Sequence, residues 1–117
     1  MTTSDTIQSY FDSLKQKKGW EAFLSDEVTF TNYSSPVKRV TGRVGCLEVL
    51  RRFYSMIKAL EIQKILVDGE QACVLIRYEL QPPGGSAFES HVAEVFEVQE
   101  GKIKAFGIYF DSAPFPK

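Results

Sequence analysis

Residues 87–111 constrain the fold of this chain more than any other stretch. They form two segments of strand-like composition joined by a turn at residues 99–102, and apolar side chains fall on both faces of each segment. A strand that is apolar on both faces has to be covered twice, by helices of its own domain and by a second surface. One carboxylate, Glu94, lies inside the apolar part of the first segment. The sequence therefore predicts a sheet covered on both sides, with an acidic group set among apolar neighbours.

The remainder of the chain alternates between helical and strand periodicity. Helices are expected at residues 5–15, where Asp5 can act as the N-cap, at residues 20–24 and at residues 43–60. Strands are expected at residues 27–33, 62–67, 72–80, 88–98 and 102–110. The Asp68-Gly69 turn joins two of these strands into a hairpin. This order predicts one α+β domain over residues 1–117, with helices on one face of a curved, mostly antiparallel sheet.

Composition excludes several classes of partner. The formal net charge of −1 provides no general attraction to nucleic acid, and no apolar run is long enough to span a membrane. Cys46 and Cys73 lie among apolar residues of a chain without a signal peptide, so we expect buried free thiols and a cytoplasmic location. His91 is the only histidine, and its spacing from the two cysteines does not match a zinc site. We therefore expect neither a bound metal nor a cofactor.

Three segments together resemble the NTF2-like superfamily, in particular its SnoaL-like and ketosteroid isomerase-like domains. They are SYFDSL in the first helix, GRVGCLEVLRRFY in the long helix and EVFEVQEGKIKAFGIYFD in the last two strands. The resemblance implies a cone-shaped, cystatin-like fold in which a curved sheet wraps the long helix and an apolar pocket opens at the wide end. It also implies a homodimer through the outer sheet face, which would supply the second covering surface.

The same resemblance suggests roles for four residues. Tyr10 falls where ketosteroid isomerases have their oxyanion-binding tyrosine, and Tyr54 where they have a supporting tyrosine. Glu94 falls near their second, protonated carboxylic acid, and a carboxyl between two apolar neighbours is expected to have a raised pKa. Asn32 stands where the family has its general base. Because an amide cannot take up a proton at neutral pH, isomerisation by that route is not expected.

Other branches of the superfamily suggest another base. Asp111 resembles the aspartate that closes the last strand in polyketide cyclases, where a carboxylate removes a proton alpha to a carbonyl. Epoxide hydrolysis requires an Asp-Arg-Asp set around a water molecule, and only Arg77 with Glu79 is a loose analogue.

Each of these residues also has a structural interpretation. Glu94 is either an inward acid or, if the strand has the opposite phase, an interface residue that leaves His91 pointing inward. Tyr10 and Tyr54 are also ordinary core aromatics, His91 is more simply a surface or interface residue, and Asp111 is also a strand-end residue. The expected ligand-binding residues are Asn32, Tyr54, Trp20, Phe30, Phe53 and Phe96.

Three functions remain open on the sequence alone. The first is a cofactor-free isomerase, cyclase or hydrolase that acts by acid/base chemistry on a small carbonyl-bearing, steroid-like or polyketide-like molecule, with Glu94, Asp111 and Tyr10 as catalytic residues. The second is a non-catalytic binder of a small apolar molecule. The third is a dimerising, partner-binding module whose pocket has filled.

Overall fold

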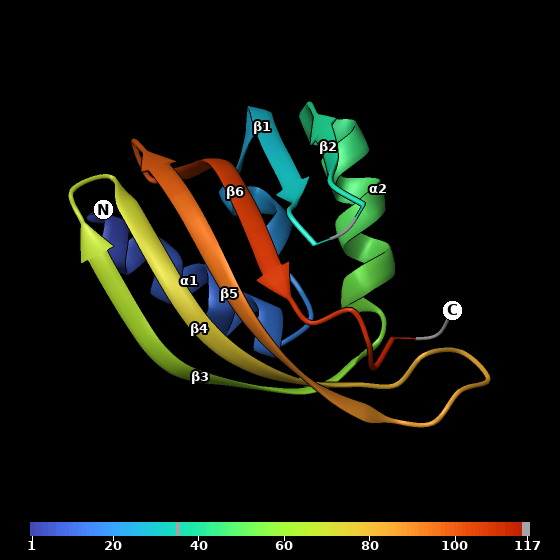
Figure 1. Ribbon diagram of the computed structural model, residues 1–117. Coiled ribbons are helices and arrows are strands. Elements are labelled where there is room, and N and C mark those ends of the chain that lie inside the picture. Colours follow the sequence, from blue (N-terminus) through green and yellow to red (C-terminus); the bar gives the residue numbers. More distant parts are fainter. Residues whose placement is uncertain (35, 116–117) are drawn as a thin grey trace.

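A computed structural model describes residues 1–34 and 36–115. Its elements are α1 (Thr3–Lys15), the 3-10 helix η1 (Trp20–Phe23), β1 (Leu24–Asn32), β2 (Lys38–Thr41), α2 (Arg43–Tyr54), β3 (Ile57–Asp68), β4 (Gln71–Leu80), β5 (Phe88–Gln99) and β6 (Lys102–Phe110). The strands form one curved sheet in the order β2-β1-β6-β5-β4-β3, antiparallel except for the β1–β6 pair. Helix α1 packs across β3, β4 and β5, and α2 packs against β1 and β2 (Figure 1). The α+β class and the curved, mostly antiparallel sheet are confirmed.

Helix α1 begins with a reciprocal cap. Thr2 is the N-cap: its hydroxyl accepts a hydrogen bond from the Asp5 N–H at 3.0 Å, and the Asp5 carboxylate accepts one from the Thr2 N–H at 3.2 Å. Asp5 was expected to be the N-cap itself and instead completes this capping box three residues into the helix. The expected apolar stripe of the helix, which includes Tyr10, is buried.

Helix α2 ends earlier than its apolar periodicity predicts. The expected helix over residues 43–60 stops at Tyr54, and Ile57 already belongs to β3. Residues 57–61 pair with residues 77–80 of β4, and the N–H of Gln81 donates to the carbonyl of Met56 at 2.7 Å. Pairing the backbone of these residues with a neighbouring strand outweighs their modest preference for helix.

The phase of β5 is resolved by burial. Val92, Glu94 and Phe96 point into the core, whereas His91 and Val95 point outward. Glu94 retains only 2% of its surface exposed. The carboxyl group is therefore an inward-facing acid.

Aromatic side chains fill the space between the sheet and α1. The rings of Phe96 and Phe106 stack with centroids 5.3 Å apart, and Phe96 also meets Tyr10 and Phe11 edge to face. Beyond β6, Phe115 packs against Phe88 and Phe110. These contacts pack the concave side of the sheet densely.

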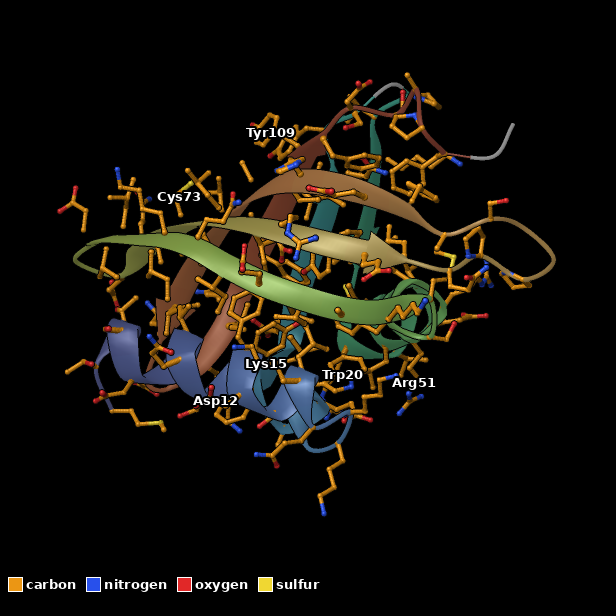
Figure 2. All side chains as sticks on the ribbon, turned by 90° about the horizontal axis from the view of Figure 1, so that it is seen from below. Asp12, Lys15, Trp20, Arg51, Cys73 and Tyr109 are labelled. Carbon is orange, nitrogen blue, oxygen red and sulfur yellow. The ribbon has the colours of Figure 1, made fainter. Side chains whose placement is uncertain are left out.

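The two cysteines are free thiols in different environments. Cys46 is buried in α2, where burial raises the pKa of its thiol, and its sulfur lies 3.5 Å from the carbonyl oxygen of Val28. Cys73 is only half-buried, because it projects from the outer sheet face, as Figure 2 shows, whereas a buried thiol was expected. Within the described ranges, no helix is both long and apolar enough to cross a membrane.

Candidate functional site

Three tyrosines and one carboxyl group meet inside the fold. Tyr10 comes from α1, Tyr54 from the last turn of α2, Tyr78 from β4 and Glu94 from β5. All four are buried, and Tyr10 and Tyr78 have no exposed surface. The hydroxyl groups of Tyr10 and Tyr54 share a hydrogen bond, and the Tyr78 hydroxyl donates another to Oε2 of Glu94. We call these four residues the tyrosine–glutamate cluster.

The pKa of the Glu94 carboxyl group lies near neutral pH. Burial disfavours its charged form and raises its pKa to about 7, although the hydrogen bond from Tyr78 acts in the opposite direction. Its second oxygen, Oε1, is buried and has no hydrogen-bond partner among the described residues. Near pH 7 the Glu94 population is therefore divided between the protonated acid and the carboxylate. In both forms Oε1 makes no hydrogen bond to a described residue.

The three tyrosines remain protonated over the physiological range. Burial raises the pKa of each well above its ordinary value, and the nearby Glu94 carboxylate raises it further. Each hydroxyl carries one proton, so one member of the Tyr10–Tyr54 pair uses its proton within the pair and the other has a proton to donate elsewhere. The cluster thus offers a titrating carboxyl group and a spare hydroxyl donor side by side.

A small cavity adjoins the cluster between α2 and the sheet. Its lining comprises Phe30, Leu50, Phe53, Tyr54, Val92, Glu94, Phe106 and Ile108. The volume open to the centre of a water molecule is about 10 Å³, which is roughly the space of one water. A larger molecule therefore requires the surrounding aromatic side chains or α2 to move.

The expected site residues divide into two groups. Phe30, Phe53, Tyr54 and Glu94 line this cavity, and Tyr10 lies behind it through its bond to Tyr54. The others are Asn32, Asp111, Trp20 and Phe96, and none of them lines the cavity. Phe96 is part of the aromatic core, and Trp20 packs edge-on against the Tyr54 ring at 4.8 Å.

Two of the polar candidates, Asn32 and Asp111, accept backbone hydrogen bonds at the ends of strands. Oδ1 of Asn32 accepts the Ser34 N–H at 2.9 Å. Asp111 is exposed just beyond β6, and its Oδ1 accepts the Ala113 N–H at 3.0 Å. Both side chains stabilise local turns, as Asn and Asp commonly do. The structure does not bring Asp111 to the cluster.

The remaining polar candidates face outward. His91 is exposed, and its Nε2 lies 2.9 Å from Oε1 of Glu89. Arg77 lies 3.6 Å from Glu61 and 3.9 Å from Glu89 on the same outer face. Glu79 is paired with Lys58 across the strands. Among the described residues, neither a histidine nor an arginine lines the cavity.

Sequence reasoning missed Tyr78 as a site residue. Its position between Ile76 and Leu80 in an alternating strand marks it as inward-facing. The register of β4 against β5 places Val74 opposite Glu94 and Ser90 opposite Tyr78, so the Tyr78 hydroxyl reaches a residue four positions along β5 from Ser90. Periodicity could have identified the face, but the pairing with Glu94 depends on the register and on the directions of the two side chains in the folded core.

The Tyr78→Phe variant tests the bond that holds Glu94. Losing the hydroxyl removes the interaction that lowers the Glu94 pKa, so this pKa is expected to rise above about 7. The free energy of unfolding is expected to fall by about 1 kcal/mol at acidic pH, where Glu94 is neutral, and by more above pH 7, where the lost hydrogen bond had stabilised the carboxylate. Carboxyl ¹³C NMR titration of Glu94 measures the first change and urea unfolding the second. An unchanged Glu94 pKa would show that the two groups are not bonded in solution.

Comparison with solved structures supports the fold. A candidate ketosteroid isomerase from Kribbella flavida superposes with a TM-score of 0.79 at 21% identity, covering 98% of this chain and 82% of its own. A candidate SnoaL-like polyketide cyclase from Mesorhizobium loti gives a TM-score of 0.77 at 16% identity, covering 93% and 99%. An epoxide hydrolase of M. tuberculosis, described as LEH-like, gives 0.77 at 23% identity, covering 93% and 82%. At these identities the likeness shows the shared NTF2-like fold alone.

Sequence comparison identifies the family. No curated protein matches the chain. The model of the SnoaL-like domain matches residues 7–106, a range that includes all four residues of the tyrosine–glutamate cluster. The chain therefore belongs to the family of SnoaL-like domains.

Proposed function

We propose that the tyrosine–glutamate cluster binds a small apolar molecule bearing a carbonyl group and that Glu94 is its acid/base residue. The observation that carries this proposal is the buried Glu94 Oε1, which has no partner among the described residues and belongs to a group that lines the internal cavity. A carboxyl group with a pKa of about 7 is matched to proton transfer at neutral pH.

The chemistry follows from the groups present. The Glu94 carboxylate takes a proton from the carbon alpha to the carbonyl, which forms an enolate and a neutral Glu94 carboxylic acid. With the Tyr10 hydroxyl donating to the Tyr54 oxygen, the Tyr54 hydroxyl donates a hydrogen bond to the enolate oxygen, where negative charge develops. The Glu94 acid then returns its proton to the same or a neighbouring carbon. Both steps are proton transfers with no change of oxidation state, so the reaction requires no cofactor.

The family supports this assignment at a coarse level. The solved neighbours carry names of a cyclase, an isomerase and a hydrolase, and the resemblance to ketosteroid isomerases assigns donor roles to Tyr10 and Tyr54. Asn32 takes the place of the base in that pattern, so the proposal assigns proton removal to Glu94. Asp111 is left out because its carboxylate is exposed and accepts a backbone hydrogen bond.

Hydrogen–deuterium exchange tests the proposal without knowledge of the natural substrate. Apolar ketones from cyclopentanone to a 3-keto steroid are incubated with the protein in deuterated buffer, and loss of alpha protons is followed by ¹H NMR. We expect at least one ketone to exchange faster than in buffer, with a rate that rises through pH 7 as Glu94 ionises. In the Glu94→Gln variant this exchange rate is expected to be at least about a hundredfold lower.

A matched control lies on the same strand. Glu97 of β5 is exposed on the outer face, so Glu97→Gln removes a carboxylate without touching the cavity and is expected to keep the full rate. Exchange that survives in Glu94→Gln, or an absence of exchange with every ketone, would contradict the catalytic assignment.

The size of the cavity favours a second candidate. With room for about one water, the interior is close to the filled state expected of a dimerising module. The outer sheet face carries an apolar patch, which we define as Tyr33, Leu66, Cys73, Leu75, Val95 and Tyr109. In this candidate function the patch, rather than the interior, is the working surface, and a second copy of the chain covers it.

A further inference from the structure

A second hollow opens on the helix side of the molecule, apart from the internal cavity. It lies where the end of α1, η1, the end of α2 and the start of β3 meet, and its volume is about 360 Å³. Figure 2 shows Trp20 and Arg51 together at this end of the molecule. The volume lies within the range of small-molecule sites in proteins.

The floor of the hollow is apolar. Leu14, Trp20, Tyr54 and Ile57 line it, and each is buried. The rings of Trp20 and Tyr54 meet edge to face at 82°. Only a small part of each side chain reaches the hollow, so they form a narrow apolar floor on which one edge of an aromatic or aliphatic body can pack.

The rim of the hollow carries more positive than negative charge. Lys17 and Arg51 line it together with one acid, Glu21. Arg51 lies 3.7 Å from the Glu21 carboxylate, and its side chain is 61% exposed, which makes this a weak, solvent-screened pair. The Arg51 guanidinium therefore keeps most of its five N–H donors for another acceptor. An apolar floor beneath a rim with an excess of positive charge matches a molecule with an apolar body and one carboxylate.

Tyr54 links this hollow with the internal cavity. It contributes to the lining of both, and its hydroxyl is bonded to Tyr10. Glu94, in contrast, lines only the internal cavity. A ligand in the hollow therefore contacts one member of the tyrosine–glutamate cluster without contacting the acid.

We propose that the hollow lined by Trp20, Tyr54, Lys17 and Arg51 is a binding site for a small aromatic or apolar monocarboxylate. The body of the ligand packs on Trp20 and Ile57, and its carboxylate accepts hydrogen bonds from Arg51 and Lys17. This site is distinct from the interior cavity and does not rest on the function proposed above.

The single tryptophan of the chain provides the readout. Trp20 lines the hollow, so its fluorescence and the NMR signal of its indole N–H report occupancy directly. The probes are 3-phenylpropionate and its neutral analogue 3-phenylpropanamide, titrated against the full chain at low salt. The carboxylate is expected to bind about fivefold more tightly than the amide, as one solvent-exposed charge pair allows.

Two variants separate the proposed contact from general charge. Arg51→Gln is expected to abolish the preference for the carboxylate. Arg52→Gln, which removes the same charge from the same turn of α2 but does not line the hollow, is expected to retain that preference. Binding is also expected to be unchanged in Glu94→Gln, which separates this site from the interior one.

Three results would overturn the proposal. They are no Trp20 response at millimolar 3-phenylpropionate, equal affinity for the acid and the amide, and an equal loss in Arg51→Gln and Arg52→Gln. Each excludes a carboxylate held by the rim of this hollow.

Discussion

Glu94→Gln is expected to become more stable relative to the natural chain as pH rises, by about 3 kcal/mol between pH 4 and pH 8. Glu94 has a folded pKa of about 7 against an ordinary value of 4.5. Between these values the unfolded chain releases the Glu94 proton while the folded chain keeps it. Stability therefore falls as pH rises through this window and levels off above pH 7. Glutamine stays neutral, so the variant lacks this loss.

Urea unfolding of both proteins at half-unit steps from pH 4 to pH 8 measures the effect. Only the difference between the two curves is used, because other groups titrate in both proteins. Glu97→Gln serves as the control, since its exposed side chain should leave the curve parallel to that of the natural chain. If Glu94→Gln instead loses several kcal/mol at pH 8, the folded pKa of Glu94 is not raised and its carboxylate is held by a stabilising partner.

Val95→Lys is expected to weaken the homodimer of the second candidate function at least about a hundredfold. Val95 lies within the outer apolar patch defined above and is 42% exposed, and on the same face the stacked rings of Tyr33 and Tyr109 lie 4.6 Å apart. Figure 2 shows Tyr109 and Cys73 projecting from this face, opposite α1 and Trp20. Exposed apolar side chains gathered on one face are typical of association surfaces, which is the reason for the second candidate function. A lysine ammonium buried at its centre would lack a partner and would cost several kcal/mol.

Sedimentation of the natural chain at micromolar concentration provides the first check, and a clean monomer would exclude the dimer. The control is Val44→Lys, because Val44 is 83% exposed on α2 and lies away from the patch. This variant introduces the same charge and should remain dimeric. Equal dissociation of both variants would point to a general charge effect instead of a contact at Val95.

Much of the fold follows from periodicity along the chain. The two strands expected at residues 88–98 and 102–110 and the helix around Tyr10 were each predicted from local pattern, and all three were confirmed. The end of α2 was not predictable in this way. Ile57 continues the helical stripe in sequence but is drawn into β3 by pairing with β4, a contact that local spacing does not encode.

The candidate site depends more heavily on register. Tyr10 and Tyr54 were recognised because the resemblance assigned them roles. Glu94 stood out as an acid among apolar neighbours, yet the face of β5 on which it lies remained open because both faces are apolar. Tyr78 was missed because its link to Glu94 exists only when β4 and β5 are aligned. Asp111 was proposed from its place after the last strand, and the structure shows its carboxylate exposed and bonded to Ala113 N–H.

The sequence by itself determined the fold class, the family and the presence of an acid among apolar neighbours, because these depend on residue type and spacing. Only the tertiary structure decided that Glu94 faces inward, that Tyr78 is its partner, and that the interior has room for about one water. It alone revealed the separate hollow beside Trp20. The reason is physical: burial, pKa and cavity volume are set by which elements pack together, and that packing is a property of the whole fold.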